Sequence, residues 1–128
     1  MLRLVLVKEV YFKMNDNLSM IYDILNEITL YLKDDTDNPV SMSLVLHNYG
    51  IHDGVAKGKA ILAAAKVLNS AENTADLTLM DFQRAFNAEV SDKFSIEPGE
   101  GQDVLYILKW LSLHQMPDLY PIVMNLAD

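Results

Sequence analysis

Cysteine is absent from this chain of 128 residues, and basic side chains are scarce, with ten Lys and Arg against eighteen Asp and Glu. Without cysteine there is no disulfide, thiolate metal ligand or cysteine nucleophile, and a cytoplasmic protein is the default expectation. The net charge of −8 repels phosphate backbones and anionic membrane surfaces and attracts basic partners. We therefore expect the partner to be basic.

Long apolar runs are also missing. Only residues 4–7 separate Arg3 from Lys8, which is too short for a secretory signal, and Lys109 interrupts the apolar segment 104–113, which is shorter than a membrane span. Glycine-rich phosphate loops and the G-x-S-x-G and H-E-x-x-H patterns do not occur. We expect no membrane association, no cofactor, and no catalytic residue that the sequence alone can identify.

Apolar residues between positions 16 and 33 recur three or four apart, which predicts a helix with one apolar face. Its start should be capped by Asp16, Asn17 or Ser19, and the DDTDNP segment that follows should stop it. The apolar face consists of Leu18, Ile21, Leu25, Ile28 and Leu32.

Further helices follow along the chain. Asn38 should cap a second helix over residues 39–49, which Gly50 ends in a left-handed conformation, and an alanine-rich third helix should span 54–69. A capping box at Thr78 and Asp81 predicts a fourth helix. Its apolar stripe contains Phe82, Phe86, Val90 and Phe94.

The end of the chain should contain the central helix of the fold. After a loop over residues 95–103, the segment up to Met116 is apolar on nearly every side, as in a buried helix or an interface helix. Pro117 should end this helix, and Asp118 should cap a short last one in which Pro121 occupies the first turn. We expect an all-α fold over residues 14–128, a compact bundle of five or six helices around a central apolar helix near residues 103–116.

Residues 1–13 are rich in β-branched and aromatic residues, so they could form an extended arm or a strand. Alternatively, the codons for the peptide KEVYFKM can contain a ribosome-binding site followed by the start codon of Met14. In that case residues 1–13 would be an over-long start of a bacterial or phage gene and would be left out of the fold.

The corner around Gly50 permits a nucleic-acid interpretation. The spacing of Gly50, Ile51 and Ala56 resembles a helix-hairpin-helix, and the same segment can be seen as a shortened helix-turn-helix; the candidate contacts are Gly50, Lys57, Lys59 and Lys66. His52 and Asp53 depart from that pattern. We favour a structural corner in which Gly50 ends one helix, Ile51 enters the core, Asp53 caps the next helix and the lysines face solvent.

Metal and enzyme interpretations have little support. His47, His52 and His114 lack the spacing of a metal site, and a calcium loop at residues 34–38 fails because its twelfth position is not a glutamate. Glu89 and Asp92 could be paired carboxylates, but such a pair usually lies on a solvated face. A small enzyme therefore ranks third among the possible functions, and no metal is expected.

The leading interpretation is a non-catalytic cytoplasmic binding protein, of the immunity, inhibitor or adaptor type, whose acidic surface engages a basic protein. Residues 70–128 hold ten acids against three bases, and loops often carry recognition. The candidate partner contacts are Glu97, Glu100, Asp103, Tyr106 and Trp110. A homodimer through the aromatic late helix is also possible, and a nucleic-acid-associated regulator that uses residues 46–66 is the second interpretation.

Overall fold

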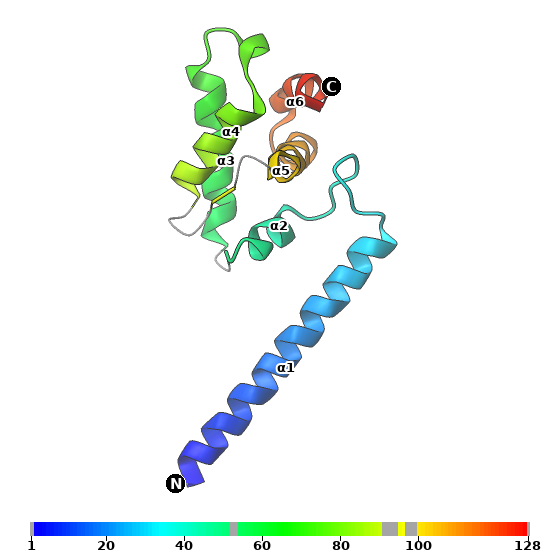
Figure 1. The fold of residues 1–128 in the computed structure, drawn as a ribbon, viewed down its shortest axis with the longest axis vertical. Helices are drawn as coiled ribbons and strands as arrows, with labels where there is room; N and C mark the ends of the chain where they lie inside the picture. Colours follow the sequence, from blue (N-terminus) through cyan, green and yellow to red (C-terminus); the bar gives the residue numbers. More distant parts are fainter. Residues whose placement is uncertain (1, 52–53, 91–94, 97–99, 128) are drawn as a thin grey trace. The chain divides into compact units, whose positions relative to one another are not determined.

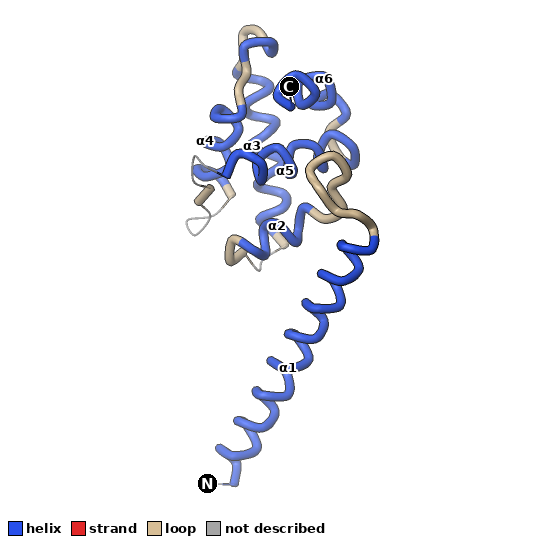
Figure 2. The backbone as a smooth tube through the Cα atoms, turned by 45° about the vertical axis from the view of Figure 1, so that its right-hand side comes forward, coloured by secondary structure: helices blue, strands red, loops and turns tan. Residues whose placement is uncertain are grey.

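The computed structural model describes the backbone of residues 2–51, 54–90, 95–96 and 100–127, and the side chains of the same ranges except residues 2–15 and 127. The regular structure in these ranges is helical throughout, with six α-helices and no strand, which confirms the predicted all-α class (Figures 1 and 2). The chain forms two compact units, Met1–Asp34 and Asp35–Asp128.

The first unit is one long helix, α1 (Leu2–Tyr31). It ends in a Schellman motif in which the amide of Asp34 donates to the carbonyl of Thr29 at 2.9 Å and the amide of Lys33 donates to the carbonyl of Leu30 at 3.0 Å. Lys33 adopts a φ of 58°, the left-handed conformation that this motif requires. The predicted stop at the DDTDNP segment is thus confirmed.

The predicted start of this helix is wrong. The extended arm or strand expected over residues 1–13 is not observed, because the backbone is helical from Leu2, and the proposed caps at 16, 17 and 19 lie inside α1. β-Branched residues lower helix propensity by only tenths of a kcal/mol each. That cost is small against the cooperativity of extending a helix that has already formed.

The second unit begins with α2 (Met42–Asn48), which starts later than predicted. Ser41, not Asn38, is the N-cap, and its Oγ accepts a hydrogen bond from the amide of Leu44 at 3.2 Å. The amide of Asn38 instead donates to Oδ1 of Asp35 at 2.7 Å, inside a turn. Asn38, which was predicted to cap the helix, therefore belongs to the turn that precedes it, and Pro39 also lies before the helix.

The corner at Gly50 is a second Schellman motif. Gly50 has a φ of 84°, its amide donates to the carbonyl of His47, and the amide of Ile51 donates to the carbonyl of Leu46. Ile51 and Leu46 are both buried. The structural interpretation is thus confirmed for Gly50 and Ile51. The predicted cap at Asp53 is wrong, because Gly54 is the N-cap of the next helix, Val55–Ser70. His52 and Asp53 themselves lie outside the described residues.

Two helices then pack side by side, α3 (Val55–Ser70) and α4 (Leu79–Glu89), with the short 3-10 helix η1 (Thr74–Asp76) between them in sequence (Figure 1). The buried face of α3 is made of small side chains, which lets the helices approach closely. These are Ala56, Ala60, Ala63 and Ala64. The capping box is confirmed, since the amide of Thr78 donates to Asp81 at 2.9 Å and the amide of Asp81 donates back to Oγ1 of Thr78.

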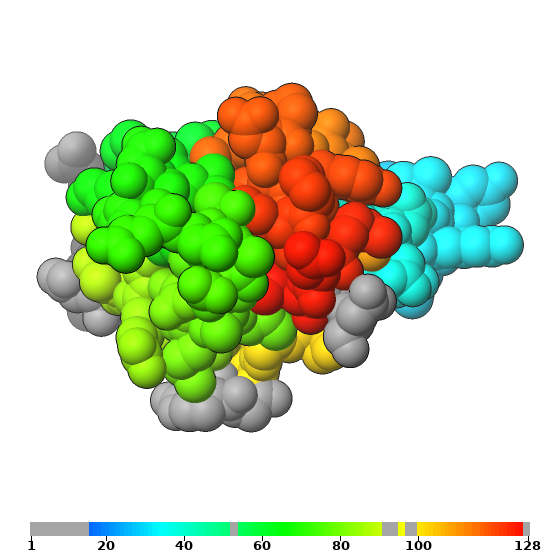
Figure 3. Space-filling model, turned by 90° about the horizontal axis from the view of Figure 1, so that it is seen from above, coloured from blue at the N-terminus to red at the C-terminus, as the bar shows by residue number. Residues whose placement is uncertain are grey.

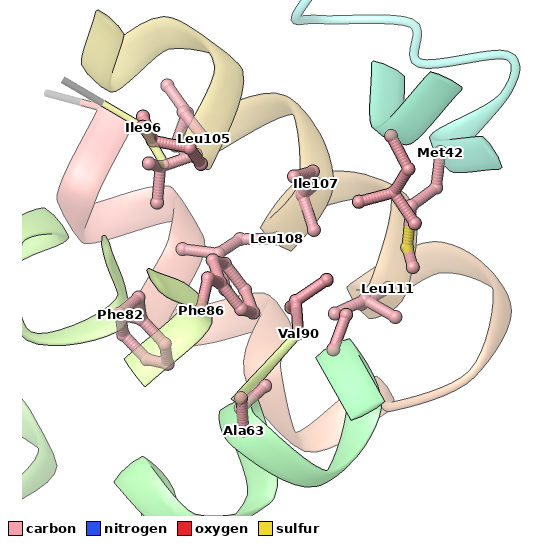
Figure 4. Packing of buried hydrophobic residues seen from close by; sticks show 14 of the residues in the cluster. Met42, Ala63, Phe82, Phe86, Val90, Ile96, Leu105, Ile107, Leu108 and Leu111 are labelled. Atoms are coloured by element: carbon pink, nitrogen blue, oxygen red, sulfur yellow. The ribbon is translucent and has the colours of Figure 1, made fainter. Parts of the chain in front are cut away.

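The central helix is α5 (Gly101–His114), as predicted. It contacts α2, α4, the 3-10 helix η3 (Pro117–Leu119) and α6 (Tyr120–Ala127). Figure 4 shows Phe86 of α4 and Val90, the residue that caps the end of α4, beside Leu108 and Leu111 of α5 in the core. Phe94, the fourth member of the predicted stripe, lies outside the described residues.

The predicted cap of the last helix is wrong. Asp118 lies within η3, which runs directly into α6, so this helix has no separate cap at that position. Pro121 does fall in the first turn of α6, where it displaces no helical hydrogen bond. Among the described residues, no helix combines the length and the apolar character needed to cross a membrane.

Candidate functional site

Two carboxylates that were predicted as partner contacts meet one tyrosine in the second unit. Glu100 immediately precedes α5 and Asp103 lies in its first turn. The hydroxyl of Tyr49, the residue that ends α2, lies 2.6 Å from Oε2 of Glu100 and 2.5 Å from Oδ2 of Asp103. All three residues are half-buried. We call Tyr49, Glu100 and Asp103 the acidic cluster.

The chemistry of the acidic cluster favours a cation. A phenol has one proton, so Tyr49 donates to one carboxylate at a time. Burial, followed by the hydrogen bonds to Asp103 and Glu100, raises the pKa of Tyr49 above its ordinary range, because ionisation would add a third negative charge. The positive end of the α5 dipole stabilises both carboxylates where they are. The cluster is thus a neutral phenol between two fixed anionic groups.

Two aromatic residues predicted to bind a partner, Tyr106 and Trp110, form hydrogen bonds to the backbone of their own chain. Tyr106 is buried, and its hydroxyl accepts hydrogen bonds from the amides of Val40 and Ser41, each at 2.9 Å. The indole N–H of Trp110 donates to the carbonyl of Val40 at 3.3 Å. Tyr106 and Trp110 therefore fasten the segment before α2 onto α5.

Other side chains of the same unit also lie against Trp110. The ammonium of Lys57 lies 4.5 Å from the centre of the Trp110 ring, and the ring of His114 is 4.7 Å away. A cation over an aromatic face is an attractive contact. The contact of Lys57 joins the start of α3 to α5, and the contact of His114 lies within α5 itself.

The candidate nucleic-acid contacts do not form one basic surface. Lys57 and Lys59 are two positions apart on α3, about 200° around the helix axis, so they face different directions. Lys57 lies over Trp110, and Lys66 forms an ion pair with Glu89 at 2.8 Å. Gly50 belongs to the Schellman motif. The arrangement offers no continuous phosphate-binding track on α3.

Metal-binding residues are not assembled in the part of the chain that is described. There, no group of three or more His, Asp or Glu is placed to hold an ion. His47 lies in the last turn of α2 and His114 in the last turn of α5. His52 and Asp92 lie outside the described residues, as does Glu97 of the predicted acidic loop.

An open groove lies between the end of α3 with η1 and the end of the chain. Its volume is about 340 Å³, and its polar lining includes Asn69, Asp118 and Asn125. Figure 3 shows this side of the second unit, with the red α6 next to the green segment that contains η1. No pair of acid and base groups meets in the groove lining, so we assign it no chemistry.

Two features of the site were missed in the sequence. The role of Tyr49 has no local signal in the sequence, because its carboxylate partners are more than fifty positions away. The second is a clamp on Ile96, whose carbonyl accepts from the side-chain amides of Gln83 at 2.7 Å and Asn87 at 3.1 Å and whose amide donates to Asn87 at 2.8 Å. The i, i+4 spacing of two amide side chains was the only available signal.

Comparison of this chain with protein-family models, with curated proteins and with solved structures found no match.

Proposed function

We propose that this chain is a non-catalytic cytoplasmic binding protein that presents its acidic cluster to a basic protein partner. The observation that supports this most is the arrangement of Glu100 and Asp103 at the start of α5, where both carboxylates lie within hydrogen-bond distance of the hydroxyl of Tyr49. Residues 70–128 add to the negative field, with ten acids against three bases. A field of this sign steers positive groups toward the site and repels nucleic acid.

The pre-organisation of the cluster is what suits it for recognition. Side chains that are already fixed lose little entropy when a partner binds. A lysine or arginine of the partner that reaches the cluster would form charge-assisted hydrogen bonds, which are roughly twice as strong as neutral ones. The acidic cluster therefore gives a basic group of the partner one defined binding position, and the other acids of residues 70–128 attract the partner less specifically.

The test is a quantitative capture experiment with the full chain and two charge-matched variants. Glu100→Gln with Asp103→Asn removes the charges of the cluster, and Glu72→Gln with Asp76→Asn removes two exposed acids near η1. Both double variants have the same net charge. We expect the native chain and the second variant to capture one protein with a basic face, and the first variant to lose it.

Equal capture by both variants would show that general acidity, and not the cluster, is responsible. Capture of nucleic acid by the native chain, lost when Lys59 and Lys66 are changed to glutamate, would contradict the proposal in favour of the second interpretation.

A further inference from the structure

The first unit contains an apolar face that a single helix cannot bury. Four residues of α1 and Leu32, which directly follows it, lie three and four apart along the chain. Each remains about half exposed or more, from 47% for Ile28 and Leu32 to 61% for Leu18. The unit Met1–Asp34 consists of α1 and its terminal turn, so it offers no second element to pack against. An apolar face of this kind requires cover from elsewhere. We call Leu18, Ile21, Leu25, Ile28 and Leu32 the α1 seam.

The spacing of the α1 seam is that of a coiled coil. The intervals are three, four, three and four, which place Leu18, Leu25 and Leu32 at the first apolar position of successive heptads and Ile21 and Ile28 at the second. The same register continues back along the sequence. The earlier positions are Leu4, Val7, Tyr11 and Met14. Asp16 and Asp23 fall at the outermost position of the heptad, away from the seam.

The residues that flank the seam favour another copy of α1 as its cover. Between residues 17 and 31 the flanking positions are Asn17, Tyr22, Ile24, Thr29 and Tyr31, none of which is charged. Two copies therefore meet without repulsion between like charges at the edges. A heptad seam is matched in period by a second helix with the same repeat, because each side chain then enters a hole between four others.

We propose that α1 is a self-association helix, and that the α1 seam is covered by α1 of other copies of this chain. Leucine at the first position with isoleucine at the second favours bundles of more than two helices. Ile24 and Tyr31 widen the apolar face, which suits such a bundle. The assembly brings several acidic clusters together on one particle, which raises its avidity for a partner that carries repeated basic groups.

The test is the solution mass of the full chain, whose single-copy mass is 14.5 kDa. Ile21→Asp with Ile28→Asp places charges in the seam, whereas Met20→Asp with Leu30→Asp places them at apolar residues that are more exposed, 61% and 77%, and lie off the seam. We expect the native chain and the off-seam variant to sediment at two or more times the single-copy mass. The seam variant should sediment at the single-copy mass and lose part of its helical signal, because α1 alone is less stable than α1 in a bundle.

Several results would overturn the proposal. A native chain that sediments at 14.5 kDa throughout the accessible concentration range would show that copies do not cover the seam. A seam variant that stays associated would show association through another surface. Equal dissociation of the two variants would show that α1 associates without using the seam in particular. A monomer that gains helix content only with anionic lipid vesicles would assign the seam to a membrane surface.

Discussion

Replacing Tyr106 by phenylalanine should destabilise the second unit through the loss of one hydroxyl. Tyr106 is only 7% exposed, and its oxygen accepts hydrogen bonds from the amides of Val40 and Ser41. Phenylalanine preserves the ring and its packing, so the change removes the hydrogen bonds of the hydroxyl and little else. Each bond contributes about 0.5–1.5 kcal/mol net, and a buried donor left without a partner costs about 1–3 kcal/mol.

The expected loss follows from where the two donors lie. Val40 and Ser41 are half-buried, so water can replace the hydroxyl in part. We therefore expect about 1 kcal/mol for each donor, or about 2 kcal/mol in all. For a unit of this size, that loss lowers the Tm by about 8–16 °C.

Urea denaturation followed by tryptophan fluorescence is the appropriate assay, because Trp110 is the only tryptophan and hydrogen-bonds to Val40 itself. Tyr120→Phe, at a residue that is 48% exposed, is the matched control and should change stability by less than about 0.5 kcal/mol. A Tyr106→Phe variant as stable as this control would refute the claim that Tyr106 fastens the start of α2 to α5.

Three further changes test neighbouring features. Trp110→Ala should cost about 3–5 kcal/mol in chemical denaturation, because it removes a large packed ring and a hydrogen bond, and a change in mass instead would place Trp110 at an interface. In an electrophoretic mobility-shift experiment at physiological salt, the native chain should not retard nucleic acid. The variant with Lys57, Lys59 and Lys66 changed to glutamate should therefore behave in the same way. Tyr49 keeps its proton in the folded chain after the unfolded chain has lost it, since its pKa is raised, so its contribution to stability is full below about pH 10 and is lost as the pH rises further. The free energy of unfolding of the Tyr49→Phe variant, measured above about pH 10, should therefore fall less steeply with pH than that of the native chain.

Helices whose boundaries depend on local chemistry could be predicted from the sequence. The capping box of α4 and the left-handed Gly50 at the end of α2 are determined by residues within a few positions of each other. The buried α5 was predicted because an apolar segment without a polar face has to be covered on all sides. These features required no knowledge of distant contacts.

The roles of Tyr106 and Trp110 could not be predicted, because they depend on contacts across more than sixty positions. The start of α2 was missed because Asn38 and Ser41 are both suitable N-cap residues, and only the structure shows that Ser41 is the one used. An aromatic residue on a late helix looks the same in the sequence whether it faces a partner or the chain's own backbone. Of the predicted acidic site, Glu100 and Asp103 do lie together, but Tyr49, which joins them, comes from another helix. The extended arm or strand considered for residues 1–13 is not formed, because the helical spacing of apolar residues in α1 extends back through Leu4 and Val7 and outweighs the β-propensity of single residues.

The association rate of the captured partner as a function of salt tests the central claim most directly. We expect the rate for the native chain to fall about tenfold or more between about 0.05 and 0.5 M salt, as the screening length shortens. Glu100→Gln with Asp103→Asn should associate more slowly at low salt and approach the native rate at high salt, while Glu72→Gln with Asp76→Asn should follow the native chain. A native rate that does not change with salt, or equal rates for the two double variants, would contradict recognition of a basic partner through the acidic cluster.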